Sequence, residues 1–159
     1  SGTIEGGSFS MLDPKTAIIG RSVRINDDGI EQLRRLLSYQ GIELIVIDMP
    51  AYYIHLDEAF VPVDKDKILV STFILPHWFL NMLRERGYKL IETDRDDPML
   101  TNNCIALEPG KVLFSAQGVK TRKNLEKAGV ETIPVDISEI NKLGGGIHCS
   151  TLPLLRESI

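Results

Sequence analysis

The chain has 159 residues, of which 43% are hydrophobic and 25% charged, and its formal net charge is −4. These values are ordinary for one soluble globular domain. Acidic and basic residues are interspersed, so we expect no basic face for nucleic acid. We also expect no membrane partner, because no apolar run could span a bilayer and no signal-peptide pattern is present. Two cysteines, Cys104 and Cys149, make no disulfide framework, which favours the cytoplasm.

The first 50 residues predict a β-hairpin followed by a helix and a strand. The expected strand, turn, strand, helix and strand cover residues 6–12, 13–16, 17–22, 29–40 and 42–48. The helix carries an apolar face at the spacing of an amphipathic helix, formed by Ile30, Leu33, Leu36 and Leu37. Gly41 is placed to cap the helix, because glycine accepts the left-handed conformation that ends many helices.

The same order of elements recurs twice more. The second copy has its elements at residues 59–63, 64–67, 68–73, 79–83 and 88–94, and the third at 103–107, 108–111, 112–116, 120–128 and 130–136. The acids that open the three turns, Asp13, Asp64 and Glu108, are 51 and 44 residues apart. The glycines that end the three helices, Gly41, Gly87 and Gly129, are 46 and 42 residues apart. Such regularity predicts a structural repeat.

We therefore predict an α/β fold built from ββαβ modules. The modules cover roughly residues 5–50, 55–96 and 102–138, and a fourth begins at 144–159. Together they are expected to form a single partial domain over residues 1–159. Structurally equivalent positions can then be compared between modules.

Polar and reactive residue types gather at the start of each module. Glu5 precedes the first module's hairpin, His55 and Asp57 the second's, and Asn102 and Asn103 the third's, while Cys149 lies at the start of the fourth. If the modules surround an axis like propeller blades, these segments converge at one end of that axis. A thiol, an imidazole and two carboxylates would then lie together although they are distant in sequence.

The stretch from Gly144 to Thr151 contains three consecutive glycines followed by Ile147, His148 and Cys149. Glycines let the backbone approach a neighbour closely or adopt positive φ. A thiol at the mouth of such a turn suits a nucleophile that attacks a planar electrophile. The alternative is a loop before a final strand, with Cys149 as a small buried apolar residue.

These groups favour cysteine chemistry on a substrate that carries a guanidine-like cation. A thiolate near neutral pH needs a base or an ion-pair partner, and His55 could supply either or act as a separate general acid. Two carboxylates in one pocket need a cation, because like charges raise each other's pKa. A planar guanidinium pairs bidentately with carboxylates and exposes its carbon to a nucleophile above the plane.

Other interpretations of the same residue types were weighed. A zinc site could use His55, Asp57, His148 and Cys149, although the chain has no Cys-x-x-Cys and no His-x-x-x-His. A serine triad lacks its Gly-x-Ser-x-Gly turn. We interpret Cys104 as a core residue and His77 as structural. His148 is interpreted as a neighbour of the site, because it points away from Cys149 if that segment is extended.

Three motifs, Glu5-Gly6-Gly7, His55-Leu56-Asp57 and Gly144-Gly145-Gly146-Ile147-His148-Cys149, resemble the guanidine-modifying, or pentein, superfamily. Its members include arginine deiminases, dimethylarginine dimethylaminohydrolases and amidinotransferases. The resemblance covers nearly the whole chain and implies a propeller of ββαβ modules with the active site on its axis. It also implies that no metal or organic cofactor is used.

The resemblance further implies a role for each motif. Cys149 would attack the guanidinium carbon, and His55 would protonate the departing amine and then activate water. Glu5 and Asp57 would bind the guanidinium nitrogens of an arginine-like substrate. The intermediate would be an amidino group on Cys149, released by hydrolysis.

Members of the superfamily carry a further guanidinium-binding aspartate upstream of the Glu-Gly-Gly motif. By module count, about two modules, on the order of 100 residues, lie outside this chain. We therefore expect self-association or a complementing N-terminal portion, because an open propeller leaves strand edges unpaired. Two alternative functions stay open: an amidinotransferase that uses an amine acceptor, and an inactive or guanidine-binding module.

Overall fold

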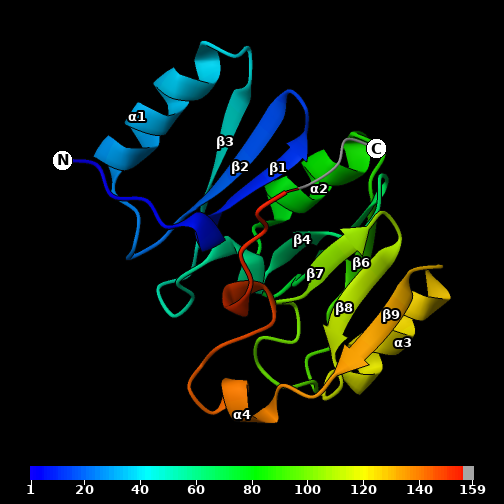
Figure 1. The fold of residues 1–159 in the computed structure, drawn as a ribbon. Coiled ribbons are helices and arrows are strands. Elements are labelled where there is room, and N and C mark those ends of the chain that lie inside the picture. The colour runs from blue at the N-terminus through cyan, green and yellow to red at the C-terminus, as the bar shows by residue number, and fades with distance from the viewer. Residues whose placement is uncertain (156–159) are drawn as a thin grey trace.

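The computed structural model describes residues 1–155, which form three separate three-stranded sheets (Figure 1). The first module consists of β1 (Phe9–Asp13), β2 (Thr16–Arg21), α1 (Asp27–Ser38) and β3 (Glu43–Asp48). The second consists of β4 (Phe60–Pro62), β5 (Lys67–Val70), α2 (His77–Glu85) and β6 (Lys89–Glu92). The third consists of β7 (Ile105–Glu108), β8 (Lys111–Ser115), α3 (Val119–Lys127) and β9 (Glu131–Val135). A short helix, α4 (Ser138–Asn141), follows and was not predicted.

Each sheet has the same internal order of strands. The first two strands pair antiparallel as a hairpin, and the third returns through the helix to pair parallel with the second. The predicted ββαβ module is therefore confirmed three times, and the side-by-side sheets in Figure 1 are compatible with a propeller. That residues 1–159 form a single domain stays a prediction.

The predicted turns and helix caps have the expected local chemistry. The carboxylates of Asp13 and Asp64 accept hydrogen bonds of 2.8 Å from the N–H groups of Lys15 and Lys65, which fixes the first two hairpins. The three glycines that end the helices, Gly41, Gly87 and Gly129, all have positive φ, between 70° and 89°. A residue with a side chain would be strained in this left-handed conformation, whereas glycine adopts it readily. The change to positive φ ends each helix.

The core lies between successive modules as well as within them. One cluster joins Ile18 and Ile47 of the first module to Phe60 and Phe79 of the second. A second cluster joins the second module to the third through residues such as Val61, Leu69, Val112 and Phe114. Cys104 belongs to this second cluster and is fully buried, which confirms its interpretation as a core residue.

The predicted strand over residues 6–12 is wrong in its first half. Gly6–Ser8 forms a 3₁₀ turn (η1), and the strand begins at Phe9. The physical reason is that Ser8 N–H bonds to the Glu5 carbonyl, 3.1 Å away, and so curls the chain. Gly7 also lies against the imidazole of His55, where an added Cβ would be 2.9 Å from the ring.

The start of the predicted fourth module has no strand within the described residues. His148–Ser150 forms a 3₁₀ turn (η3) instead. The last four residues of that module, 156–159, lie outside the described residues.

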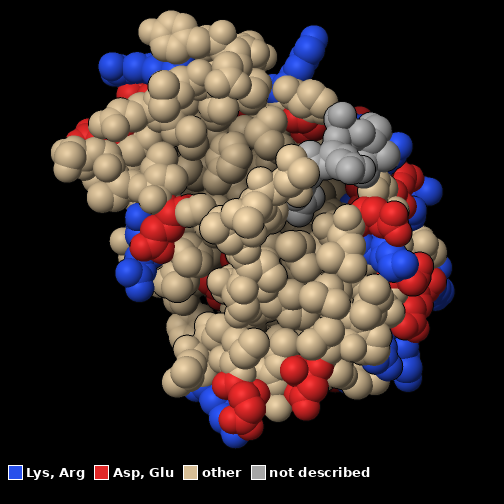
Figure 2. Space-filling model, viewed as in Figure 1, with Lys and Arg blue, Asp and Glu red and all other residues tan. Residues whose placement is uncertain are grey.

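The surface carries charges of both signs. On the face shown in Figure 2, lysine, arginine, aspartate and glutamate alternate around the rim, and the middle is mostly uncharged. Over the described residues, no helix is long and apolar enough to cross a membrane.

Phe79 and Trp78 provide a test of packing between modules, because they are neighbours on α2 with opposite environments. Phe79 is fully buried with its ring 5.5 Å from that of Phe60, whereas Trp78 is half exposed. We expect Phe79→Ala to lower the free energy of unfolding by about 3–5 kcal/mol. Trp78→Ala, the matched control, should cost about 1 kcal/mol or less. Urea unfolding followed by circular dichroism measures both, and equal losses would contradict this account of the core.

Candidate active site

Three short turns bring the predicted site residues to one place. They are η1, η2 (Leu56–Glu58) and η3, each at the start of a module. In Figure 1 the red segment with η3 lies between the first and second modules, beside the starts of their hairpins. Below it, a cavity of about 330 Å³ runs between the first strands of the three sheets, with Asp57 and His148 in its wall. Two residues of the site, Asp57 and His148, therefore line this cavity, the channel between the modules.

All four predicted residues meet at this place. His55 Nε2 lies 2.6 Å from Glu5 Oε2, so the imidazole donates to that carboxylate. Cys149 Sγ lies 3.9 Å from Asp57 Oδ2. The ligand-type atoms of His55, Asp57 and Cys149 are all within 4.8 Å of one another. A thiol, an imidazole and two carboxylates thus face a common volume, although the sequence separates them by up to 144 residues.

His55 is held by its own turn. The Glu58 carboxylate accepts hydrogen bonds of 2.9 Å from the N–H groups of Ile54 and His55. These bonds join the last residue of η2 to the two residues before it. On the other side, Gly7 leaves room for the imidazole. The Glu5 carboxylate that receives the imidazole also lies 3.7 Å from Arg24 Nη1.

Asp57 is the buried acid of the site, with 6% of its surface exposed. Its Oδ2 accepts a hydrogen bond of 2.7 Å from His148 Nδ1 and faces the Cys149 thiol. Its Oδ1 is buried and has no hydrogen-bond partner among the described residues. A buried carboxylate oxygen without a donor is costly, so this atom is prepared for a donor from a ligand.

Asn103 positions Cys149, a role that the sequence did not indicate. Its Oδ1 accepts from Cys149 N–H at 3.1 Å, and its Nδ2 donates to Cys149 Sγ at 3.2 Å. Its backbone carbonyl also accepts from the N–H groups of Ile147 and His148. The available signal was its place at the start of the third module, where the other modules carry site residues.

Two of the three consecutive glycines before Ile147 have a clear structural role. Gly144 has a φ of 75°, which reverses the chain after α4. A Cβ at Gly146 would collide with the carboxamide of Asn103. Glycine at residue 146 therefore allows Asn103 to reach Cys149.

His148 corrects one interpretation from the sequence. An extended segment would point His148 away from Cys149 and make it only a neighbour of the site. The segment is a 3₁₀ turn, and the His148 imidazole contacts Asp57 directly. His77, in contrast, is exposed on α2, where its Nε2 lies 3.0 Å from Asn81 Nδ2.

The thiols of the chain differ in their ionisation. Loss of hydration and the nearby Asp57 carboxylate raise the pKa of Cys149, and the hydrogen bond from Asn103 opposes this shift. Complete burial raises the pKa of Cys104 to about 12, which leaves that thiol unreactive. In the free protein, Cys149 is therefore a thiol that a nearby cation would help to ionise.

The ligand-type atoms of His55, Asp57 and Cys149 are also close enough to one another to bind one metal ion. The zinc interpretation therefore stays open on geometry, and the absence of a cofactor stays a prediction.

Comparison with known proteins identifies the family. The family model described as "N,N dimethylarginine dimethylhydrolase, eukaryotic" matches residues 1–156. The chain belongs to this family. Its resemblance to the guanidine-modifying superfamily is thereby confirmed.

Individual relatives and structures agree with this family. An arginine deiminase of Mycoplasma capricolum is 29% identical, over 99% of this chain and 48% of its own length. A dimethylarginine dimethylaminohydrolase of Pseudomonas aeruginosa, solved with citrulline as a cysteine-to-serine mutant, is 25% identical with a TM-score of 0.74, over 91% of this chain and 53% of its own. An inosamine-phosphate amidinotransferase of Streptomyces griseus has a TM-score of 0.84 at 18% identity, over 99% of this chain and 48% of its own. The chain thus spans about half the length of these relatives.

The ionisation of Cys149 can be tested with two substitutions of opposite sign. Asp57→Asn removes a carboxylate that raises the pKa of Cys149, so alkylation at pH 8 should become faster. Asn103→Ala removes a hydrogen bond that lowers this pKa, so alkylation should become slower. Iodoacetamide labelling followed by mass spectrometry measures both rates, with the buried Cys104 as the internal unreactive control. Changes in the same direction for both variants would contradict the assigned causes.

Proposed function

We propose that this chain belongs to a hydrolase that acts on the guanidine group of arginine or an arginine derivative. The observation that carries the proposal is Asp57: its Oδ1 is buried with no hydrogen-bond partner among residues 1–155, and its Oδ2 faces the Cys149 thiol. A guanidinium supplies both things that this site needs. Its N–H groups satisfy the oxygen, and its charge offsets the buried carboxylate.

The second carboxylate supports the same ligand. Glu5 is 42% exposed and already bonds to the His55 imidazole, so it stands at the solvent side of the site. A planar guanidinium between Glu5 and Asp57 would present its carbon to the sulfur of Cys149. Such placement turns an encounter between two molecules into a reaction within one complex.

The mechanism follows from these positions. The bound guanidinium lowers the pKa of Cys149, which burial and the Asp57 carboxylate raise in the free protein, and the thiol proton passes to the His55 imidazole. The thiolate attacks the guanidinium carbon to form a C–S bond, and a C–N bond breaks as His55 gives this proton to the departing amine. His55 then takes a proton from water while the water oxygen attacks the amidino carbon. The C–S bond breaks, the proton on His55 returns to the sulfur, and the ureido product leaves after its hydroxyl proton passes to solvent. Asn103 holds the sulfur in place throughout.

Two other functions use the same site. In an amidinotransferase, an amine rather than water would attack the amidino-cysteine, and the likeness in fold to the Streptomyces griseus amidinotransferase is compatible with this. In a binding module, the guanidinium would bind without turnover. The residues around Cys149 are common to all three.

We propose that further protein covers the open side of the channel, either a second copy of this chain or a complementing N-terminal portion. Two residues of the outer modules support this: Met11 on β1 and Leu107 on β7 are apolar and 39% and 54% exposed.

The unpaired state of Cys104 and Cys149 supports a cytoplasmic location.

Turnover tests the role of Cys149. The protein, with its complementing portion if one is required, is incubated with arginine and with dimethylarginine, and citrulline is measured. Cys149→Ser should lower the rate by at least about a thousandfold, because it removes the nucleophile. Cys104→Ser, at the buried cysteine, is the matched control and should retain the chemistry once folding is verified. Citrulline formation by Cys149→Ser at the wild-type rate would refute the assignment.

The same incubation separates the three functions. With glycine added as an amine acceptor, guanidinoacetate in place of citrulline would identify an amidinotransferase. Guanidine binding in calorimetry without either product would identify a binding module. A mass increase on Cys149 in intact-protein spectra would report the amidino intermediate that both enzymes share.

Association is tested by light scattering of the purified chain. We expect a dimer or larger species, or a shift to a defined complex when an N-terminal portion is supplied. In either case the exposed apolar residues Met11 and Leu107 would be covered. A stable, monodisperse monomer that gains nothing from either partner would contradict this expectation.

A further inference from the structure

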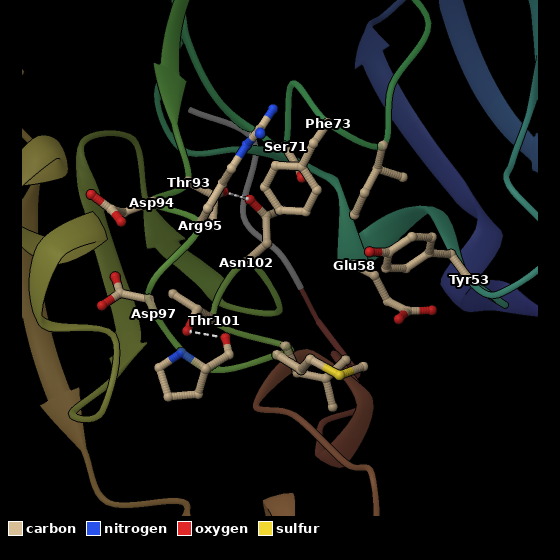
Figure 3. A pocket seen from close by; sticks show the side chains of 14 residues that line it. Tyr53, Glu58, Ser71, Phe73, Thr93, Asp94, Arg95, Asp97, Thr101 and Asn102 are labelled. Atoms are coloured by element: carbon tan, nitrogen blue, oxygen red, sulfur yellow. Dashed lines mark hydrogen bonds between the residues drawn. The ribbon is translucent and has the colours of Figure 1, made fainter.

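A second cavity of about 110 Å³ lies beside the active site, between the second module and the segment that leads into the third. Its wall comes from η2 and the preceding loop, the segment after β5, and residues 93–102. In Figure 3, Asp94 and Asp97 lie on one side and Tyr53 and Glu58 on the other, with Ser71, Phe73 and Asn102 between them. Neither Cys149, His55 nor Asp57 belongs to this wall.

Two buried polar atoms of this wall have no hydrogen-bond partner within residues 1–155. Ser71 is 1% exposed and Asn102 is 2% exposed. The Oδ1 of Asn102 accepts a hydrogen bond of 2.5 Å from Thr93, but its Nδ2 bonds to nothing among the described residues, nor does Ser71 Oγ. An amide nitrogen can only donate, and a hydroxyl can donate as well. Because unpaired buried donors are costly, two of them in one cavity indicate a ligand that accepts hydrogen bonds.

The same wall provides a cation. The Arg95 guanidinium lies 5.3 Å from the centre of the Phe73 ring and forms no ion pair within the part of the chain that the structure describes. Stacking on an aromatic ring orients a guanidinium without neutralising it. Arg95 is therefore available to an anion at this cavity.

The acids of the wall are already engaged. Both oxygens of Asp97 accept backbone N–H groups, from Lys120 at 3.2 Å and from Thr121 at 2.6 Å. Asp94 accepts from Asp96 N–H at 3.0 Å, and Glu58 accepts the two N–H groups of its own turn. These N–H groups partly offset the negative potential of the three carboxylates, which stay ionised. An anion at this cavity therefore depends on the positive charge of Arg95.

We propose that this cavity binds the carboxylate of a small organic acid, with Ser71, Asn102 and Arg95 as its donors. A cavity of about 150 Å³ accommodates benzene, so the enclosed part of this one suits about four non-hydrogen atoms, and the rest of a slightly larger acid would extend toward solvent. Acids of the size of propionate and small α-amino acids such as alanine share this chemistry. In an α-amino acid, the ammonium would additionally face the acidic side walls.

The site is adjacent to the catalytic segments but separate from them. Glu58 follows Asp57 and holds the backbone of His55, and Asn102 precedes the Asn103 that holds Cys149. A ligand here therefore contacts two segments that position the cysteine and the imidazole. The proposal concerns binding alone, so it does not rest on the proposed hydrolase function.

The test is a calorimetric or NMR titration of the full chain with propionate and alanine. Propionamide, which lacks the charge, and ethylammonium, which has the opposite charge, are the matched probes. Ser71→Ala and Arg95→Gln should each weaken propionate binding by about tenfold or more, because hydrogen bonds to a charged group are strong. Ser38→Ala and Arg35→Gln, at exposed positions of α1, are the matched control variants.

Each outcome decides the proposal. Propionate binding that is lost in both cavity variants supports it, and tighter binding of alanine assigns the amino-acid source. Ser71→Ala should not lower the melting temperature, because its hydroxyl has no partner to lose, so loss of binding there cannot be attributed to unfolding. Absence of binding, equal binding of propionamide, or preference for ethylammonium would overturn it. An equal loss in Asp57→Asn would also overturn it, because the acid would then bind at the cysteine.

Discussion

The buried carboxylate of Asp57 is the constraint around which the rest of the site is arranged. Removing a charge from water is costly unless donors or an opposite charge compensate it. His148 compensates one of its oxygens, and the other has no partner among the described residues. The site is thus incomplete in a way that favours a cation with several N–H groups. Burial and the same charge raise the pKa of Cys149, and a cation beside the thiol would oppose this shift.

The repeated module explains how such a site is assembled from distant residues. Each module begins with a short segment before its hairpin, and these segments lie at the same end of the channel. The first segment supplies a carboxylate, the second an imidazole and a carboxylate, the third an amide and the fourth a thiol. Because the sheets support these segments independently, the side chains can differ in chemistry while the backbone framework stays the same.

The third module differs from the others in the role of the segment that precedes its hairpin. Both polar atoms of the Asn103 side chain bond to Cys149. It holds the backbone and the sulfur of the Cys149 turn. Its neighbour Asn102 faces the opposite way, into the second cavity. Adjacent residues thus serve two different volumes, because the chain turns here: Asn103 N–H bonds to the Leu100 carbonyl at 2.9 Å.

The sequence by itself determined the module order, the turns, the helix caps and the family, because these depend on local patterns. Apolar spacing, turn acids and cap glycines act within a few residues, so a linear search finds them. The roles of Asn103 and His148 were decided only by the tertiary structure. Asn103 contacts a turn 46 residues away and His148 contacts an acid 91 residues away, and no local pattern encodes either distance. The 3₁₀ turns at residues 6–8 and 148–150 were also missed, because close contacts with His55, Asp57 and Asn103 override the local preference for a strand.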